Sequence, residues 1–466
     1  MQTDHQIPFY IDRNVTSDLP DEISQQELDL FMEKSAAAGL YYHGEPMRYC
    51  FAPIVFNPGA KKFFSGIVAT ISSICEKVTQ RYQTSEEHRK LWELDELTKD
   101  LALLPKQYSA PIPIMRADIF LNPETNDFKF CEVNTDGSSS MNEDFLCTQL
   151  VSGSSAWFQL LEKDNAQPQE LFEPFVDDIL NIFCEWMQGK DAFNKPQVAI
   201  VDYPEDATPK EFIEFQKRFS NRGVDCVVVD INDLRFKNGS LLIGETKINV
   251  VYRRAVTNLI VDDLYSKGID RLSKIDGSDC EGAAALVSAA MYNVAVVVGG
   301  FHTLLAHNKQ LFEVLWDERT WKFLSSNEVD FIQAHVPKTF DFARTNNRLN
   351  IDNIYLDKNR WILKPKYGSS TIGVFAGIDC LDNESWIAIC EECFNQGDYV
   401  IQEYCEQFSE PNIIPQDGSR KLSEFNYIIG LFNSCGKYVG TYVRGGKGAI
   451  IGSIRGSAVV ASFHKM

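Results

Sequence analysis

Hydrophobic residues recur with helical spacing in two long segments of the N-terminal part of the chain. Residues 63–82 (FFSGIVATISSICEKVTQRY) and 171–187 (LFEPFVDDILNIFCEWM) place apolar side chains three and four positions apart, as one face of a helix does. Between them, 115–134 alternates apolar and polar residues on both sides of the turn-forming PETND, which predicts a β-hairpin. We therefore expect residues 1–194 to form a mostly helical region that carries one hairpin.

From Lys195 the pattern changes to short, continuous apolar runs. The runs 197–203 (QVAIVDY) and 225–231 (DCVVVDI) are typical of buried strands, and the segment between them is typical of a helix. At its start, Thr208 is expected to be the N-cap, Pro209 the first residue, and Glu211 to reach back to the cap. This β-α-β order predicts a parallel sheet.

Two further apolar runs are expected to extend this sheet, 248–256 (INVVYRRAV) and 294–300 (VAVVVGG). The stretch 282–301 is apolar over almost its whole length, but Tyr292 and Asn293 interrupt it. We interpret it as a buried helix followed by a buried strand, not as a membrane span.

The remaining range, 302–466, is expected to hold a third unit. It contains a helix (NKQLFEVLW), a strand with a Gly-rich loop (RWILKPK), a second strand (DYVIQEYCE) and a terminal β segment (FNYIIGLF to GKYVGTYVRG). Because 466 residues exceed one ordinary core, two or three domains are expected. The predicted fold is an α/β or α+β enzyme with units 1–194, 195–301 and 302–466.

Composition narrows the classes of partner. The formal net charge of −20 argues against nucleic acid and anionic membranes, which need clustered Lys and Arg. It permits a cationic substrate such as a polyamine, although solubility is the more ordinary cause of such a charge. The oligomeric state is left open, with a homo-oligomer as one option.

Cysteine usage and the N-terminus indicate a cytoplasmic protein. Twelve cysteines are spread through the chain, many in apolar runs, as free buried thiols in a reducing compartment are. Cys390 and Cys393 form a CxxC, but neither a second CxxC nor paired His follows it, so we expect no zinc site. The N-terminal MQTDHQIPFYIDRN lacks the apolar core of a signal peptide.

The hairpin carries the first candidate chemistry. If Asn122 pairs with Phe128, Asp118 lies opposite Glu132 and Arg116 lies opposite Asn134, all on one face. The other face then carries the mostly apolar side chains of Met115, Ala117, Ile119, Cys131 and Val133. Opposed carboxylates repel unless a cation separates them, and an oxygen-only set suits Mg²⁺. The alternative is a solvated sheet face with an Arg–Asp pair.

Polar segments at strand ends are the next candidates. The sequence NTDGSSS, with Ser138 and Ser139, directly follows the hairpin and is either a flexible loop or a rim that contacts substrate. Arg253 and Arg254 end a predicted strand and are basic candidates for the same substrate. Lys and Arg at such ends are also commonly just solvated.

A lysine before a Gly/Ser turn suggests phosphate binding. In 361–374 (WILKPKYGSSTIGV) a buried strand presents Lys364, and the small residues that follow, Gly368, Ser369, Ser370 and Gly373, let backbone N–H groups approach phosphate oxygens. The order differs from that of a P-loop, which places its Lys after the loop.

Two more segments fit a nucleotide. The strand end 399–408 (YVIQEYCEQF) offers Gln402 or Glu403 to a purine edge and Glu406 to a ribose, or it is an ordinary strand end. Near the C-terminus, Arg444, Lys447 and Arg455 are interleaved with Gly, which suits either an anionic ligand or an exposed basic hairpin.

Together these segments resemble the circularly permuted ATP-grasp family typified by glutathionylspermidine synthase. The shared motifs run from about residue 110 to the C-terminus: R-x-D at Arg116 and Asp118, E-x-N at Glu132 and Asn134, NK at Asn308 and Lys309, K-P-x-x-G from Lys364 to Gly368, and QEY from Gln402 to Tyr404. The metal residues precede the nucleotide lysines, which is the permuted order.

The resemblance implies a fold and roles. It implies a permuted ATP-grasp nucleotide domain, a Rossmann-like β-α-β unit before it, and ATP with Mg²⁺ as cofactors. Asp118, Glu132 and Asn134 would hold Mg²⁺, Lys309 and Lys364 would bind the α- and β-phosphates, and the loop from Gly368 to Gly373, with Ser369 and Ser370, would close over the triphosphate. Residues 402–404 would face adenine, with Glu406 near the ribose. Arg116 would steady the transferred phosphoryl group, and we add Arg444 as a catalytic candidate.

The implied reaction is ATP-dependent amide formation between a carboxylate, peptide-like or glutathione-like, and an amine or polyamine, through an acyl phosphate. Bifunctional members of the family carry an N-terminal amidase domain with a Cys nucleophile, and we expect no such domain in the residues before the hairpin. Residues 134–140 (NTDGSSS) and 251–254 (VYRR) also differ from what the glutathione–spermidine pair leads us to expect. Two alternatives remain open: an ATP-dependent phosphotransferase, and a catalytically silent binding protein of the same fold.

Overall fold

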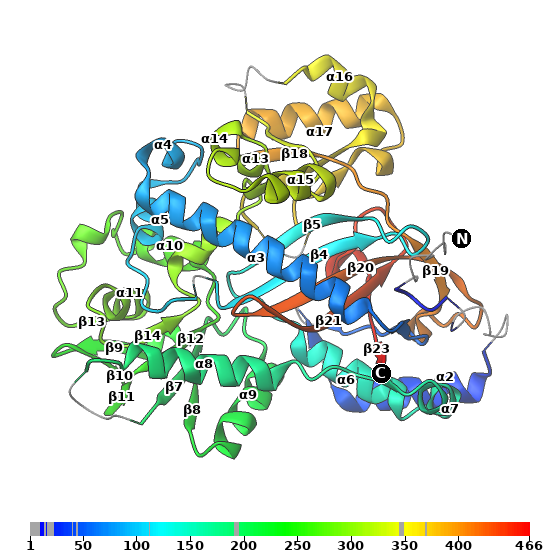
Figure 1. Cartoon of the computed structure of the whole chain (residues 1–466), viewed down its shortest axis with the longest axis horizontal. Coiled ribbons are helices and arrows are strands. Elements are labelled where there is room, and N and C mark those ends of the chain that lie inside the picture. The colour runs from blue at the N-terminus through cyan, green and yellow to red at the C-terminus, as the bar shows by residue number, and fades with distance from the viewer. Residues whose placement is uncertain are drawn as a thin grey trace, which may run out of the picture.

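The computed structural model describes residues 10–13, 15, 23–39, 41–42, 45–110, 112–190, 195–343, 349–368 and 371–466. Over these ranges the chain has a mixed α/β fold with three principal sheets (Figure 1). Residues from all three sheets line a common cavity.

The central sheet joins the predicted hairpin to the C-terminal strands. Its order is β22-β21-β20-β4-β5, and β19 also pairs with β20. The strands are β4 (Ile114–Leu121), β5 (Phe128–Asn134), β19 (Ser409–Asn412), β20 (Ser423–Ser434), β21 (Lys437–Gly446) and β22 (Ala458–Val460). One sheet thus combines strands from the ranges 1–194 and 302–466.

Alternation along these strands gives the central sheet two different faces. One face buries Ala117, Ile119 and Leu431 under the long helix α3 (Ala60–Thr84), which crosses the sheet in Figure 1. The opposite face carries Arg116, whose guanidinium lies over the Tyr442 ring at 5.4 Å from its centroid. The residues with candidate chemistry therefore lie on the face away from α3.

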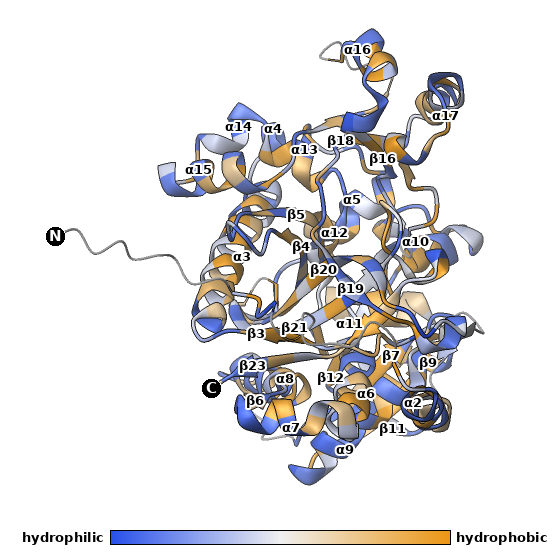
Figure 2. Cartoon of the chain, turned by 90° about the vertical axis from the view of Figure 1, so that its right-hand side faces the viewer, coloured by the Kyte–Doolittle hydropathy of each residue, from blue (hydrophilic) through white to orange (hydrophobic). Residues whose placement is uncertain are grey.

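The second sheet is parallel, as the β-α-β pattern predicts. Its order is β14-β12-β7-β8, and every neighbouring pair is parallel. The strands are β7 (Gln197–Asp202), β8 (Asp225–Asp230), β12 (Val250–Arg253) and β14 (Val296–Val298), with helices α8 (Phe172–Trp186), α9 (Pro209–Asn221), α10 (Thr257–Ser266) and α11 (Ala283–Met291). The inner strands β7 and β12 are mostly apolar, as the colours of Figure 2 show, and nearly all of their residues are buried.

The stretch 282–301 forms α11 followed by β14, as expected. In the described part of the chain, no helix is both long and apolar enough to cross a membrane.

The predicted capping box of α9 is wrong. Thr208 is the N-cap and Pro209 lies in the first turn, but the Thr208 side chain makes no capping hydrogen bond. Glu211 does not reach back. Its carboxylate instead accepts hydrogen bonds from the backbone N–H groups of Ser140, Met141 and Asn142, because these free donors begin a neighbouring helix.

The third sheet contains strands from the two segments 361–374 and 399–408 that the sequence suggests for nucleotide binding. Its order is β15-β18-β16-β17, with β15 (Thr339–Asp341), β16 (Trp361–Pro365), β17 (Phe375–Ala376) and β18 (Tyr399–Glu403). Helices α16 (Ile351–Leu356) and α17 (Asn383–Gln396) share a core with it, and this core buries both Cys390 and Cys393. The CxxC is therefore a packing feature.

The predicted helix 308–316 forms only in its later part. α12 (Leu304–His307) ends before Lys309, and α13 (Leu311–Leu315) begins after it, so Lys309 lies in a turn.

Smaller elements complete the fold. The other helices are α2 (Gln25–Ala38), α4 (Glu86–Arg89), α5 (Glu96–Ala102), α6 (Met141–Ser152), α7 (Ser155–Lys163), α14 (Glu318–Trp321) and α15 (Ser326–His335). Three further sheets are present. One pairs β1 (Tyr41–Tyr42) with β2 (Glu45–Pro46), and a second has the order β3-β23-β6, with β3 (Ile54–Phe56), β6 (Ala166–Gln167) and β23 (Ser462–Lys465). The last has the order β11-β10-β9-β13, with β9 (Leu234–Lys237), β10 (Ser240–Ile243), β11 (Thr246–Ile248) and β13 (Cys280–Glu281).

Candidate active site

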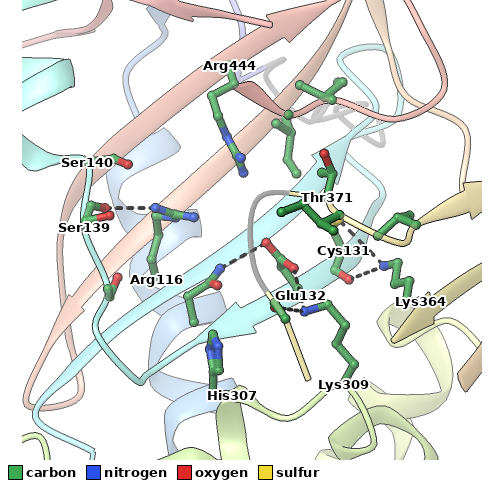
Figure 3. Close-up of a pocket in the computed structure, with 18 of the residues that line it drawn as sticks. Arg116, Cys131, Glu132, Ser139, Ser140, His307, Lys309, Lys364, Thr371 and Arg444 are labelled. Atoms are coloured by element: carbon green, nitrogen blue, oxygen red, sulfur yellow. Dashed lines mark hydrogen bonds and ion pairs between the residues drawn. The ribbon is translucent and has the colours of Figure 1, made fainter. Parts of the chain in front are cut away.

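A cavity of about 340 Å³ lies where the three principal sheets meet. Thirteen of the candidate residues from the sequence line it: Arg116, Glu132, Asn134, Ser138, Ser139, Arg254, Lys309, Lys364, Gly368, Gln402, Glu403, Tyr404 and Arg444. Figure 3 shows Arg116, Glu132, Lys309 and Lys364 converging from separate elements, with Arg444 facing them.

A β-bulge sets the register of the hairpin at this site. The hairpin end pairs Leu121 with Phe128, one residue away from the predicted pairing. The register then shifts so that Asp118 pairs with Glu132 and Arg116 with Asn134, as predicted. The extra residue is Cys131 on β5.

The bulge also moves Cys131 away from its predicted place on the apolar face. Cys131 lines the cavity, and its Sγ lies 4.0 Å from Lys364 Nζ. A bulge re-aims a side chain in this way, and sequence alternation alone does not reveal it.

The three predicted metal residues converge. The Asn134 amide Nδ2 donates to Asp118 Oδ2 and to Glu132 Oε1, at 3.4 Å each. Asp118 is fully buried, however, and is absent from the cavity lining. Arg116 contacts its carboxylate at 2.7 and 3.1 Å, and Arg444 contacts it at 2.6 Å. Both Asp118 oxygens are therefore paired with arginines.

Two lysines stand beside Glu132. Lys309 Nζ lies 3.8 Å from Glu132 Oε2 and donates to the Gly368 carbonyl at 2.9 Å. Lys364 Nζ donates to Gln402 Oε1 at 2.7 Å and to the Cys131 carbonyl at 2.9 Å. The two lysines thus come from different elements and flank one cavity.

The charges around Glu132 keep it ionised. Burial alone would raise the pKa of the Glu132 carboxyl, but Lys309, Lys364, Arg444 and Arg116 lower that pKa to about 2. Burial lowers the pKa of Lys309, an effect that Glu132 opposes. This end of the cavity therefore presents one carboxylate among several cations, an arrangement suited to phosphates with a bound cation.

The edge of the third sheet supplies an apolar slot with polar ends. Ile362, Val374 and Ile450 line the cavity there, with Tyr404 packed against the same small cluster. The Glu403 carboxylate is paired with Arg360 at 2.8 Å. Glu406 is exposed and is not among the cavity-lining residues, and Ser369 and Ser370 lie outside the described residues.

The loop of Ser138, Ser139 and Ser140, here called the serine loop, is held by hydrogen bonds at the other end of the cavity. Arg116 Nη1 donates to the Ser139 carbonyl at 2.9 Å, and Glu211 accepts from the N–H of Ser140 at 3.0 Å. Arg254 Nη1 pairs with Glu211 Oε1 at 2.5 Å. Within the described residues, Ser138 Oγ is buried without a partner and faces the cavity, which leaves it free for a ligand.

Arg253 is not a cavity residue, contrary to the sequence-based expectation. Its side chain is fully buried, pairs with Asp136 at 2.5 Å and donates to the carbonyl oxygens of Gly299 and Ala255. It ties the ends of β12 and β14 to the loop after β5. Strand alternation separates it from Arg254, whose side chain does reach the cavity.

Sequence reasoning missed an acidic region of the lining. Asp202 ends β7, Glu205 and Asp206 follow it, and Glu143 lies in the first turn of α6. Burial raises the pKa of Asp202 to about 6 and, together with Glu211, that of Glu143 to about 7. A usable signal was present, because ligands of parallel sheets bind at the carboxyl ends of strands, where VDYPED lies.

The three basic residues near the C-terminus do not all belong to the site. Arg444 on β21 reaches Asp118, and residues 449–452 line the cavity. Lys447 lies over the Phe425 ring, and Arg455 donates to the Val374 carbonyl at 3.2 Å, so neither belongs to the lining.

The donor set at the hairpin fits Mg²⁺. Glu132 and Asn134 offer cavity-facing oxygens, and Asp118 lies next to them. Among the described residues, no group of three or more His, Cys, Asp or Glu side chains could hold a metal by itself. A cation here would therefore need oxygens from a ligand, as Mg²⁺ bound to phosphates does.

Comparison with known proteins gives a structural likeness only. No family model and no curated protein matches the chain. A glutathione synthetase-like effector from Globodera pallida, in its apo form, aligns with a TM-score of 0.56 and 14% identity over 94% of this chain and 96% of its own. A protein described as a candidate gamma-glutamylcysteine synthetase from Methylobacillus flagellatus covers 84% of each chain, with a TM-score of 0.39 and 10% identity, too low for an argument. The chain therefore has a fold similar to that of a glutathione synthetase-like protein over nearly its whole length.

Proposed function

We propose that this protein is an ATP- and Mg²⁺-dependent carbon–nitrogen ligase that forms ADP and an acyl phosphate. One observation carries the proposal: a single cavity has a cationic end, built around Glu132, Lys309 and Lys364, and an acidic end, built around Glu143 and Asp202. A ligase of this kind must bind a polyanionic nucleotide beside a cationic amine.

The cationic end suits ATP. Lys309 and Lys364 would contact its phosphates, and the loop that begins at Gly368 would cover them. The adenine ring of ATP would enter the slot between Ile362 and Ile450, with Gln402 at the edge of the ring. This arrangement supports a permuted ATP-grasp domain, in which the metal residues precede the nucleotide lysines.

Glu132 and Asn134 would hold Mg²⁺, with the carboxylate of Asp118 beside them. The ion would neutralise phosphate charge as the γ-phosphoryl group is transferred. Arg116 is anchored by Asp118 and faces the same space, so it is placed to steady that phosphoryl group on the acid.

The acid and the amine would share the opposite end. Ser138, Ser139 and Arg254 offer a hydroxyl, backbone groups and a guanidinium to a peptide-like acid. Asp202, Glu205, Asp206 and Glu143 favour an amine that carries positive charge, such as a polyamine, over an anionic acceptor.

A phosphate-release screen tests the proposal. ATP, Mg²⁺, an acid (γ-glutamylcysteine or glutathione) and an amine (glycine or spermidine) are combined in all pairs. We expect free phosphate only when both an acid and an amine are present. A phosphotransferase would consume ATP without free phosphate, and a silent binding protein would release none with any pair.

A matched pair of variants checks the nucleotide assignment. Lys364→Ala removes a buried, charged hydrogen-bond donor, which is worth about 1.5–3 kcal/mol, and should raise the ATP KM roughly 10- to 100-fold. The exposed Lys322→Ala should leave the KM unchanged. An unchanged ATP KM in Lys364→Ala would remove the ATP assignment.

A further inference from the structure

Glu143 lines the cavity, and the proposed function gives it a part in attracting the amine but no part in the bond-forming step. It lies in the first turn of α6, it is only 8% exposed, and its side chain lines the cavity. Its Oε2 atom is buried and has no hydrogen-bond partner within the described residues. An unpartnered carboxylate oxygen at the wall of a cavity is ready to accept a proton or a hydrogen bond from a ligand.

The surroundings of Glu143 come from several elements. Asp144 neighbours it on α6, and the charged and titratable groups that act on it from other elements are Glu211 of α9, Arg254 after β12, Arg116 of β4, Tyr49 before β3 and Tyr442 of β21. Glu211 is already committed to Arg254 and to the N-terminus of α6. Asp144 does not line the cavity, so Glu143 is the carboxylate of this group that stays available to a ligand.

The position of Glu143 relative to the reaction centre is fixed through the serine loop. Ser140 is the N-cap of α6, three residues before Glu143, and Arg116 donates to the carbonyl of the preceding residue, Ser139. Arg116 thus lies on one side of the loop that begins the helix of Glu143. An acid held at Ser138 and Ser139 would therefore lie near both Arg116 and Glu143.

We propose that Glu143 is the general base that takes a proton from the attacking ammonium group. This inference rests on the proposed ligase function. A protonated amine, R′–NH₃⁺, cannot attack because its lone pair is occupied. Transfer of one proton to the Glu143 carboxylate frees the lone pair, nitrogen then bonds to the acyl carbon, and the C–O bond to phosphate breaks. The second proton leaves nitrogen with the departing phosphate, so that RCO–OPO₃²⁻ and R′–NH₃⁺ give RCONHR′, HPO₄²⁻ and H⁺. A base whose pKa lies near neutrality is well suited to this transfer.

Hydroxylamine separates this role from a structural one, because it is uncharged at neutral pH and needs no base. With glutathione or γ-glutamylcysteine as the acid, Glu143→Gln should form hydroxamate at the wild-type rate. Its amide formation with spermidine at pH 7 should fall roughly 100-fold or more, within the 10²–10⁴ range typical of a lost general base. This deficit should shrink as the pH rises toward the pKa of the amine. The control Asp144→Asn changes a buried carboxyl that does not line the cavity, and it should affect neither reaction.

The outcomes distinguish the two proposals. Absence of hydroxamate in the wild-type enzyme rejects the ligase. Normal hydroxamate with normal amide formation in Glu143→Gln rejects the base, as does equal loss of both reactions.

Binding of spermidine without any acid gives an independent reading by calorimetry. The wild type should bind it more tightly above pH 7 than below, because ionised Glu143 faces the ammonium group. Glu143→Gln should lose that pH dependence, and an identical pH profile in the two proteins would overturn the inference.

Discussion

At the scale of single residues, the site depends on a buried ionic cluster and on the space left for it. Asp118 binds two arginines, Arg116 and Arg444, and both lie on the cavity side of the central sheet. Gly430 of β20 pairs directly with Asp118 and carries no side chain on this face. A Cβ atom there would approach Arg116 Cδ to 2.7 Å and Asp118 Oδ1 to 2.9 Å.

Gly430→Ala should therefore displace the Arg116–Asp118 pair and reduce ligase turnover at least tenfold, because Arg116 must be well placed to act. Turnover and the thermal midpoint are measured together. Gly66→Ala is the control: Gly66 is exposed in the middle of α3 with nothing within 4 Å of a new Cβ, and the change should stabilise the protein by about 0.5–1 kcal/mol. Full activity in Gly430→Ala would show that Arg116 tolerates displacement.

Asp118 and Glu132 should respond differently to loss of charge. Asp118→Asn leaves two arginines without their buried partner and should cost about 3–5 kcal/mol in the free energy of unfolding. Glu132→Gln should abolish Mg²⁺-dependent ATP turnover with a smaller loss of stability, because Glu132 is partly exposed and a Gln can still accept the hydrogen bond from Asn134. Denaturant unfolding and ATP turnover of both variants check this. Normal turnover in Glu132→Gln would reject its role at the cation.

At the scale of elements, α15 is joined to α3 through one carboxylate. Glu328 closes a capping box with Ser325 and also accepts from Lys77 at 2.7 Å and from Ser73 at 2.9 Å. Burial would raise the pKa of Glu328, but these donors lower it to about 2. Its contribution to stability is therefore full above its unfolded pKa, near 4.3, and is lost as the pH falls through about 2.

Glu328→Gln should lower stability by about 1–2 kcal/mol at pH 7, a modest value because Lys77 is 40% exposed and solvent screens the pair. The difference from the wild type should disappear as the pH falls from 4 to 2. Thermal midpoints of both proteins across this range test the prediction. A constant difference down to pH 2 would mean that the charge of Glu328 is not what matters.

Sequence patterns predicted elements well and local exceptions poorly. The alternation of 115–134 predicts the hairpin and the Asp118–Glu132 pairing, since strand side chains must alternate between a core and a cavity. The bulge at Cys131 and the turn at Lys309 depend on tertiary packing, to which periodicity is blind. The same holds for Glu211: its spacing fits a capping box, yet the unsatisfied N–H groups of α6 lie within its reach. In these three places the local structure depends on contacts with residues distant in sequence.

At the scale of the whole molecule, the cavity depends on strands from opposite ends of the chain. Strand β20 pairs with β4 along six residue positions, from Ile429 opposite Ile119 to Ser434 opposite Ile114. A fragment of residues 302–466 would expose that edge and the apolar face of β20. We predict that this fragment does not fold alone, and that mixing it with residues 1–301 restores ATP-dependent turnover. Circular dichroism and thermal unfolding of the fragment test this, and a cooperative transition in isolation would show an independent domain.

The central claim, that the acid is activated as an acyl phosphate, is tested most directly by labelling the carboxylate of the acid substrate with heavy oxygen. In the predicted mechanism a carboxylate oxygen attacks the γ-phosphorus, so the phosphate released during amide formation must carry one labelled oxygen, with ADP as the only nucleotide product. Mass spectrometry of the phosphate and chromatography of the nucleotides give both readings from one reaction. Unlabelled phosphate, or label transferred to AMP, would contradict the account.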